Sequence, residues 1–600
     1  MDDFVLVLGD LGTVGEAMQK GAGRAGRADC EGEVVIHAGP GRSFRLGMVL
    51  GLAIAGSVAA GPGAGAQSAS QAVDPGQIEK RFEVRPKRKQ DVAPLIPVIQ
   101  GELPPERARA ISFVLSGLVV EGATVFPQSE LAALYEGLLA RQVTLEDIYK
   151  VAAAIGKKYT DAGYILSRVS VPGQEVELGI IRIRVVEGHL ENIIFEGSVK
   201  GPTDLLQAYA KKITESQPLR REVLERYILL MNDLPGVSAV RRLVPVPGRE
   251  GAYNLVITLN QDAEYGFARF DNRGSRFSGP FQGWAGAGLN SAFGRWNNAQ
   301  ARFVTATQTS ELTFGDLAYS EVVGADGTKL SAGVSASFSE PGHTLARDKV
   351  KTRGLFGSLG AEYPLVRSRR QDLFVGAQLT ALDSFRDELG SRVTHDKIRV
   401  LRLSTRYGVL DGLDGRNNVN LMLSRGLGLM AATQAGDSLV SRTGAPSDFT
   451  KLNFDVSRYQ PFGPRWGLLA VVAGQRSATK LFLSEQYGVG GEYIGRGYDP
   501  AEIAGDDALA GKIEVQWTSP EEGGFLTQYQ YYLGYDHGAT WLRSSRDDFE
   551  LASASLGARL LLKGGYFASL EIAKPLTRQV AALGDNGNDL RLFFVLSANF

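Results

Sequence analysis

The residues of this chain that could do chemistry are few and scattered. There is one cysteine, Cys30, and none of the five histidines belongs to a pair with ligand spacing such as H-x-x-x-H. His537 follows Asp536 directly but lies on the opposite face of an alternating segment, and no G-x-S-x-G elbow or P-loop occurs. The run from Gly9 to Gly15 imitates a dinucleotide fingerprint, but Leu11 replaces its middle glycine and no βαβ unit follows. The sequence therefore predicts no catalytic residue, no metal site and no cofactor.

Charge and composition exclude further classes of protein. The formal net charge is −1 at pH 7, whereas a large nucleic-acid footprint needs a strong basic excess, so no nucleic-acid partner is expected. Hydrophobic residues make up 44% of the chain, which suits a soluble protein. It equally suits a transmembrane barrel, because the strands of a barrel alternate lipid-facing and lumen-facing residues. After residue 70 no apolar run reaches the length of about 18 residues that a spanning helix needs, so pattern must separate the two classes.

Residues 1–66 read as a leader that contains a secretory signal peptide. Arg42 and Arg45 precede a short apolar run at 46–60, and Ala64-Gly65-Ala66 follows as an A-x-A cleavage site. We expect cleavage after Ala66; the alternative is a transmembrane anchor, for which the run is too short and too rich in glycine and alanine. Residues 1–41 are unusual for a signal peptide, and a start codon assigned too early would explain them. Cys30 lies before the cleavage site, so the mature chain would contain no disulfide.

Residues 67–108 are expected to hold a short helix and a linker. Residues 74–84 could form a helix with Asp74 near its N-cap. Residues 85–105 contain five prolines and a basic run at 85–89, a composition typical of an extended linker. The basic run is interpreted as a solvated part of the linker; contact with anionic partners is the alternative.

Residues 109–188 and 189–261 share the order β-α-α-β-β. In the first unit, Thr144-Leu-Glu-Asp147 is a capping box that opens a helix through Tyr159, and Gly163 ends it. An earlier helix is expected from Pro127, with Leu131, Leu134 and Leu138 at helical spacing. In the second unit, helices are predicted near 202–213 and 219–232, before strands at 238–246 and 253–260. The pair resembles tandem polypeptide-transport-associated (POTRA) domains, with Gly163-Tyr164, Leu234-Pro-Gly-Val237 and the strand at 180–188 as the most specific matches.

From residue 262 the pattern changes to segments of about ten residues with period-2 alternation, typical of transmembrane barrel strands. We predict about 16 antiparallel strands, an even number that can close a barrel. The expected fold class is thus α+β POTRA domains followed by an all-β transmembrane barrel at 262–600. A propeller is the alternative, but no repeat of about 40–50 residues is found. The predicted strands start near residues 262, 281, 297, 310, 327, 353, 371, 396, 415, 450, 465, 508, 526, 550, 565 and 590.

The alternation also predicts which side chains face the inside of the barrel. Within 527–538, Tyr531, Leu533 and Tyr535 share one face, whereas Tyr532 and Asp536 lie on the other. A charge is tolerated inside a barrel and costly against lipid, so Asp536 is expected to face the lumen. The last strand, from residue 590, alternates up to Phe600, and a terminal phenylalanine in such a strand resembles an outer-membrane insertion signal.

Three motifs are similar to those of the two-partner secretion transporters of the hemolysin/filamentous-hemagglutinin secretion-activation family. The predicted first barrel strand, 270–280, contains Asp271-Asn272-Arg273-Gly274, similar to the family's D-N-R-G. A glycine-rich loop from Gly490 ends in Gly495-Arg496-Gly497-Tyr498, which matches V-R-G-Y except that Gly495 replaces valine. The segment 533–538 resembles F-x-D-x-G and contains Asp536. The resemblance covers 67–600 and extends, more remotely, to the BamA-type assembly factors.

The resemblance implies an outer-membrane pore that secretes, and could activate, a partner exoprotein such as an adhesin or hemolysin. Its POTRA domains would lie in the periplasm and capture the unfolded client by β-augmentation, or else only support the barrel. The loop would fold into the lumen and Arg496 would pair with Asp536; the alternative is a solvated arginine. The helix at 74–84 resembles the family's plug. The barrel assembly machinery and outer-membrane lipid are the other implied partners.

Three other functions compete with secretion. An assembly factor that inserts other barrels, of the BamA type, is the main alternative; two POTRA units, the linker and the plug-like helix favour secretion. A passive porin would not carry the POTRA pair. An enzyme is disfavoured because the sequence contains no catalytic constellation, and no nucleotide is expected because the periplasm lacks ATP. Folding of the client outside the cell would supply the energy.

Overall fold

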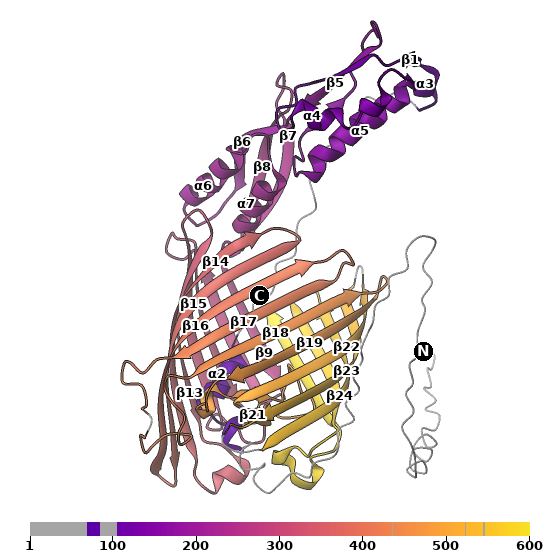
Figure 1. The fold of residues 1–600 in the computed structure, drawn as a ribbon. Coiled ribbons are helices and arrows are strands. Elements are labelled where there is room, and N and C mark those ends of the chain that lie inside the picture. Colours follow the sequence, from indigo (N-terminus) through magenta and orange to yellow (C-terminus); the bar gives the residue numbers. More distant parts are fainter. Residues whose placement is uncertain (1–68, 84–104, 435, 522–523, 544–546) are drawn as a thin grey trace, which may run out of the picture. The chain divides into compact units, whose positions relative to one another are not determined.

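A computed structural model describes residues 69–83, 105–434, 436–521, 524–543 and 547–600 (Figure 1). The predicted signal peptide and nearly all of the predicted linker lie outside the described residues. Within these ranges, no helix has both the length and the apolar character that crossing a membrane requires.

The first α+β domain contains a three-stranded sheet in the order β2-β5-β4 and a separate two-stranded sheet of β1 and β3. Thr144 caps α5 and forms the predicted capping box with Asp147, and Gly163 adopts a φ of +90° just beyond that helix. The helix expected from Pro127 was predicted too long: it is a five-residue helix followed by a 3-10 turn, and Gly137 lies in that turn. The elements are α3 (Pro105–Ala110), β1 (Ser112–Val114), β2 (Gly117–Glu121), α4 (Gln128–Ala132), η1 (Glu136–Leu138), β3 (Gln142–Thr144), α5 (Leu145–Asp161), β4 (Arg168–Ser170) and β5 (Ile180–Val186).

The second α+β domain follows the prediction closely. Its strands form a sheet in the order β6-β8-β7, with β6 and β8 parallel. The apolar faces of its two helices pack on this sheet, and Tyr209, Ile213, Met231 and Leu255 are fully buried between them. The elements are β6 (His189–Gly197), α6 (Thr203–Thr214), α7 (Arg221–Asp233), β7 (Val237–Pro245) and β8 (Ala252–Gln261).

The rest of the chain forms a closed antiparallel barrel of 16 strands, as predicted. Each strand starts within five residues of its predicted position, but several are longer than expected, up to 20 residues in β16. The strands are β9 (Glu264–Asp271), β10 (Gln282–Asn290), β11 (Asn297–Ala306), β12 (Thr313–Val323), β13 (Thr328–Ser339), β14 (Lys351–Arg367), β15 (Gln371–Glu388), β16 (Ser391–Leu410), β17 (Arg416–Gly426), β18 (Thr450–Pro461), β19 (Trp466–Ser477), β22 (Asp507–Pro520), β23 (Leu526–Trp541), β24 (Asp548–Leu562), β25 (Tyr566–Pro575) and β26 (Arg591–Asn599).

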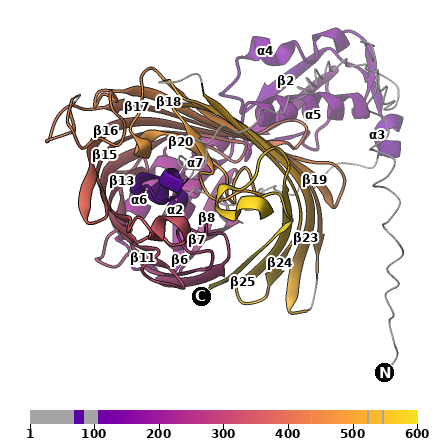
Figure 2. The ribbon, with the colours of Figure 1, turned by 90° about the horizontal axis from the view of Figure 1, so that it is seen from below.

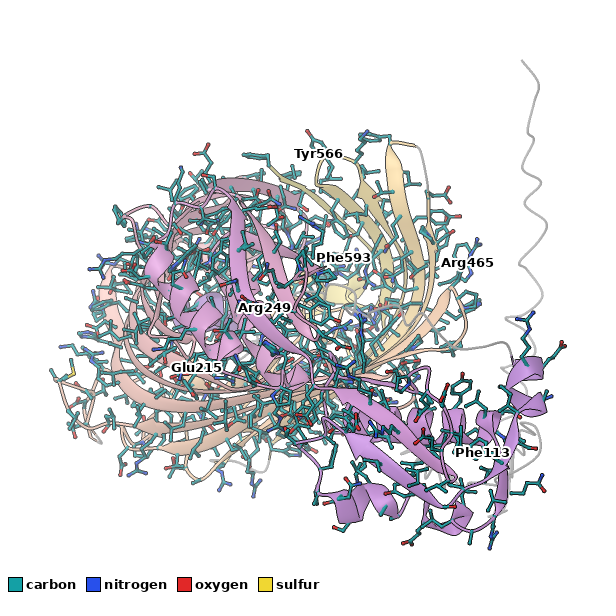
Figure 3. All side chains as sticks on the ribbon, turned by 90° about the horizontal axis from the view of Figure 1, so that it is seen from above. Phe113, Glu215, Arg249, Arg465, Tyr566 and Phe593 are labelled. Carbon is teal, nitrogen blue, oxygen red and sulfur yellow. The ribbon has the colours of Figure 1, made fainter. Side chains whose placement is uncertain are left out.

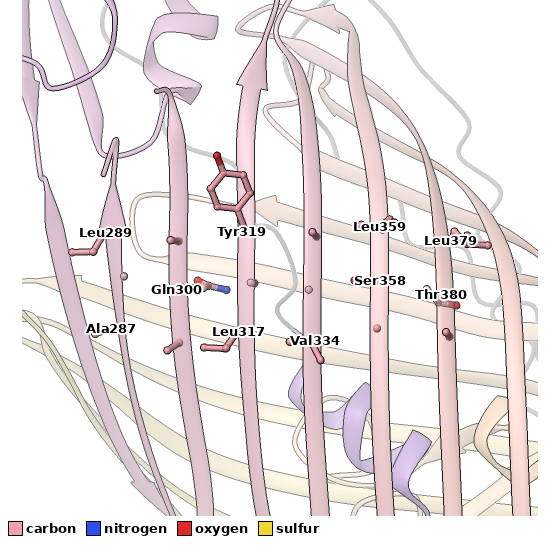
Figure 4. Close-up of a pocket in the computed structure, with 18 of the residues that line it drawn as sticks. Ala287, Leu289, Gln300, Leu317, Tyr319, Val334, Ser358, Leu359, Leu379 and Thr380 are labelled. Carbon is pink, nitrogen blue, oxygen red and sulfur yellow. The ribbon is translucent and has the colours of Figure 1, made fainter. Parts of the chain in front are cut away.

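The barrel wall is apolar outside and polar inside. In β23, Tyr531, Leu533 and Tyr535 are 52%, 61% and 49% exposed on the outside, whereas Tyr532 and Asp536 are buried on the inside, as the alternation predicted. Figure 3 labels Tyr566, an exposed residue of β25, and Phe593, a buried residue of β26. A shallow concavity of about 1000 Å³ lies on β10 to β15 and is lined by exposed leucines such as Leu317 and Leu359 (Figure 4). This surface suits contact with lipid chains.

The barrel closes where β26 meets β9. This seam has five residue pairs, whereas each other pair of neighbouring wall strands has at least eight. The main chain of Phe600 extends it, because Phe600 and Gly266 exchange two hydrogen bonds of 3.0 and 2.7 Å. Phe600 itself is 78% exposed. The main chain of Phe600 therefore belongs to the wall.

Candidate functional site: the loop and the helix inside the barrel

A long loop between β19 and β22, residues 478–506, folds into the barrel. It contains the one-turn helix η3 (Leu483–Glu485) and the hairpin of β20 (Tyr487–Val489) and β21 (Ile503–Gly505). Its tip, 494–498, is buried: Ile494 and Tyr498 pack with Val471 and Leu551 of the wall in one apolar cluster. The loop that the family resemblance implied would enter the lumen thus lies against the inner wall.

Arg496 at the tip binds two carboxylates of the wall. Its Nε and Nη2 donate to Asp536 Oδ2 and Oδ1, both at 2.9 Å. Its Nη1 donates to Glu514 Oε2 at 2.6 Å. Arg496 is 2% exposed and both carboxylates are buried. The structure therefore brings Arg496 and Asp536 together in a bidentate, charge-assisted pair.

Five further residues complete a network of contacts that the sequence analysis did not predict. Glu514 binds Arg559 at 2.7 Å, and Glu571 accepts from Tyr532 Oη at 2.5 Å and from Arg273 at 2.8 Å. The six charged members balance, with three arginines (273, 496 and 559) against three acids (514, 536 and 571). Strand alternation places Glu514 and Glu571 on the inner face of the barrel. Their arginine partners lie on β24 (Arg559) and in the turn after β9 (Arg273), and the residue pattern of a single strand does not reveal these pairings.

The D-N-R-G motif was predicted to lie within the first strand, but only Asp271 belongs to that strand, and the other three residues form the turn that follows. β9 ends at Asp271, whose carboxylate accepts from the main-chain N of Arg273 at 2.9 Å and so starts the turn. Gly274 is required there, because a Cβ would lie 1.9 Å from the carbonyl oxygen of Gly279. Arg273 stacks 4.2 Å from the Phe593 ring. The turn therefore connects β9 to the charge network.

Asn272 in this turn also bridges the seam. Its Nδ2 donates to the carbonyl of Leu592 at 2.8 Å, and its Oδ1 accepts from the main-chain N of Phe594 at 2.7 Å. The side-chain amide thus continues the ladder between β9 and β26 beyond the last paired residues. The sequence motif singled out Asn272, but not this role.

The other motif residues fix the loop tip by shape. Gly495 has a φ of +90°, and a Cβ there would lie 3.0 Å from Leu551 Cδ1. Glycine is therefore well suited to a position where the family pattern has valine. Gly497 approaches Ser553 of β24 so closely that a Cβ would lie 2.9 Å from Ser553 Cβ. The Tyr498 hydroxyl donates to the carbonyl of Ala552 at 3.1 Å.

The helix predicted at 74–84 is α2 (Pro75–Phe82), and it lies inside the ring of strands (Figure 2). Asp74 caps it, accepting from the main-chain N of Gly76 at 2.9 Å and of Gln77 at 3.1 Å. Ile78 and Phe82 pack with apolar side chains of β11 and β12, and the Phe82 ring lies 4.7 Å from that of Trp284. Two polar side chains of α2, Gln77 and Lys80, contact the loop 478–506. Among the described residues, no group of three or more His, Cys, Asp or Glu side chains could hold a metal ion.

The carboxylate of Glu187, in the first α+β domain, accepts several hydrogen bonds. Burial acts to raise the pKa of Glu187, but hydrogen bonds from Thr124, from Tyr159 and from the main-chain N of Val125 outweigh it. The pKa of Glu187 therefore lies below its usual value. This carboxylate ties the chain after β2 to α5.

Comparisons with known proteins agree with this architecture. A family model described as "POTRA domain, ShlB-type" matches residues 113–188, and one described as "Haemolysin secretion/activation protein ShlB/FhaC/HecB" matches residues 251–560. The heme/hemopexin transporter protein HuxB of Haemophilus influenzae (strain 86-028NP) is 21% identical over 472 residues, which are 75% of this chain and 81% of the relative. The outer membrane transporter CdiB of Dickeya dadantii (strain 3937) is 23% identical over 445 residues, 70% and 75% of the two chains.

Two solved structures share the fold. CdiB from Escherichia coli has a TM-score of 0.66 at 20% identity and covers 90% of this chain and 100% of its own. CdiB from Acinetobacter baumannii has a TM-score of 0.59 at 14% identity, with 91% and 100% covered.

Proposed function

Because the chain belongs to the haemolysin secretion/activation family, we propose that α2 closes the lumen of its barrel at rest and that an unfolded partner protein crosses there. The match over residues 251–560 confirms the family that the motifs indicated. The chain is an outer-membrane pore of two-partner secretion, with its POTRA domains in the periplasm. The observation that carries the proposal is that α2 and the loop 478–506 both lie inside the ring of strands, where a client that crosses the barrel would have to pass.

In this proposal the periplasmic domains receive the client. The edge strands of their sheets, β2 and β4 in the first domain and β6 and β7 in the second, are the places where an extended client segment could add a strand. Arg496 keeps the loop tip against the wall. Outer-membrane lipid covers the outer wall, and the barrel assembly machinery inserts it. The chain performs no catalysis and binds no nucleic acid.

Comparison of secreted proteins tests the proposal even while the partner is unidentified. The proteins in the medium are compared between a strain that produces the intact chain and a strain that produces a chain without residues 109–261. Heat-modifiable migration is used to check that the two strains contain equal amounts of folded barrel. We expect a large exoprotein to disappear from the medium of the second strain. Unchanged medium with depleted outer-membrane proteins would instead indicate an assembly factor, and unchanged medium and membranes would refute a receptor role for the two domains.

A further inference from the structure

α2 makes several of its polar contacts with one short turn of the lumenal loop. Others join it to the rest of the barrel: Arg81 Nη2 donates to the carbonyl of Arg273 at 3.1 Å, and Arg302 Nη1 donates to the carbonyl of Phe82 at 2.7 Å. Gln77 Nε2 donates to the carbonyls of Leu483 and Gln486 at 3.1 and 3.0 Å. Lys80 Nζ donates to the carbonyls of Ser484 and Gln486 at 2.6 and 2.9 Å. Two side chains one turn apart on the helix thus reach three main-chain carbonyls of η3 and the residue after it.

The same turn fits the start of α2 by shape. A Cβ on Gly76 would lie 2.4 Å from Ser484 Cβ, so the close approach of helix and turn requires glycine at position 76. The Ser484 hydroxyl donates to the capping carboxylate of Asp74 at 3.2 Å. The turn therefore contacts both the cap and the polar face of the helix.

The turn is itself anchored to the wall by one buried carboxylate. Glu485 accepts from Arg402 of β16 at 2.7 Å and pairs with Lys451 of β18 at 2.7 Å. Glu485 and Lys451 are 3% and 2% exposed. Lys451 Nζ also donates to the Glu485 carbonyl at 2.7 Å. The loop tip is held by other residues, on β22 and β23.

We propose that the turn 483–486 is the docking site of α2 in the closed pore and that Glu485 is the positioning residue that holds this site against the wall. The inference rests on the proposed role of α2 as a plug. Its physical basis is a division of contacts. Uncharged carbonyls bind the helix, whereas ion pairs bind the turn to the strands. When α2 leaves, Glu485 keeps its ion pairs with Arg402 and Lys451. The docking site is therefore not left with an unpaired buried carboxylate, which would be costly.

Pore conductance of the purified full chain in planar lipid bilayers tests the proposal. Lys80→Met removes two hydrogen bonds from a charged donor, and we expect the open probability to rise about tenfold or more. Glu485→Gln weakens the anchor, and we expect a similar rise. Lys563→Met, at an exposed position of the turn after β24, is the matched control and should behave as the unaltered chain.

Combination of the variants separates positioning from a general structural defect. If Glu485 acts through the docking site, Lys80→Met should add little in the Glu485→Gln background, and heat-modifiable migration should stay normal in both. A Glu485→Gln chain that stays closed, or strictly multiplicative effects in the double variant, would overturn the proposed role of Glu485.

Three further variants distinguish the docking inference from the plug itself. Deletion of residues 69–83 should open the pore; an unchanged conductance would refute α2 as a plug. If the deletion opens the pore but Lys80→Met and Gln77→Ala do not, the plug stands and the docking site is refuted. A disulfide between Gln77→Cys and Leu483→Cys should keep the pore closed until reductant is added, and opening with the disulfide formed would also contradict the docking site.

Discussion

Removal of the Arg496 side chain should displace the loop tip without unfolding the barrel. Arg496→Ala deletes two hydrogen bonds to Asp536 and one to Glu514. Breaking a buried ion pair on one side costs about 3–5 kcal/mol. The lower end applies here, because Asp536 keeps the main-chain N of residue 496 at 2.9 Å and Glu514 keeps Arg559. A cost of about 3 kcal/mol shifts the ratio of docked to undocked tips about a hundredfold.

The charge balance of the network makes the double variant informative. Arg496→Ala leaves three acids against two arginines, and Asp536→Asn restores equality. We therefore expect the double variant to export no worse than Arg496→Ala alone, because the two residues act as one unit. Export is measured as the partner protein in the medium at matched barrel levels, and the tip position as protease cleavage within 490–498.

Arg295→Ala provides the control for loss of an arginine. Arg295 pairs with Glu321 at 3.0 Å but is 64% exposed, so its removal should cost at most about 1 kcal/mol and leave export unchanged. Unimpaired export by Arg496→Ala, or losses that simply add in the double variant, would show that docking of the tip on Asp536 is not needed for secretion.

Three further perturbations test other parts of the structure. Gly495→Val places a β-branched residue at a φ of +90° and close to Leu551; this should cost about 1–2 kcal/mol of tip docking and raise protease cleavage of the loop. Asn272→Ala removes two hydrogen bonds across the seam, about 2 kcal/mol, and should lower the temperature at which heat-modifiable migration is lost, whereas Asn599→Ala should not. Glu187→Gln should speed amide hydrogen exchange of α5 at pH 7, and the difference between the two chains should shrink as the pH falls below the ordinary range of a glutamate. Since the pKa of Glu187 is lowered in the folded domain, its stabilisation is present above about pH 5 and disappears as the pH falls through the folded value. Equal exchange in the two chains at pH 7 would contradict the assigned hydrogen bonds.

Local pattern predicted most of the fold because each element depends on a few neighbouring residues. The capping box at Thr144 and the alternation around Asp536 involve neighbours within one turn or one strand. The end of β9 was missed because the alternation of residue types continues past Asp271, whereas the chain turns there when the Asp271 carboxylate binds the main chain of Arg273. The helix from Pro127 was predicted too long because its leucine spacing persists beyond the point where the helix ends.

The site was predicted in part, because its partners are distant in the sequence. The family motifs and the alternation of residues along the strand together identified Arg496 and Asp536, which are 40 residues apart. Arg273 and Glu571 are 298 residues apart and meet only because the barrel closes between β26 and β9. The contact of Lys80 with η3 spans more than 400 residues and involves main-chain carbonyls, which carry no sequence signature. Such contacts depend on how the barrel closes and where the loop docks, and the residue pattern of a single strand contains no information on either.

The two sets of contacts inside the barrel differ in what their separation would cost. Detaching the tip would leave Asp536 and Glu514 buried with one cation fewer, whereas detaching α2 from the turn 483–486 would leave main-chain carbonyls that water can bind. The apolar contacts of Phe82 and Ile78 add to the hold on α2, but a hydrophobic client segment can replace them with contacts of the same kind. On the proposed function, a client that enters the lumen would therefore displace the helix before the loop tip. The pore would open while the ion pairs that keep its wall and loop in register stay intact.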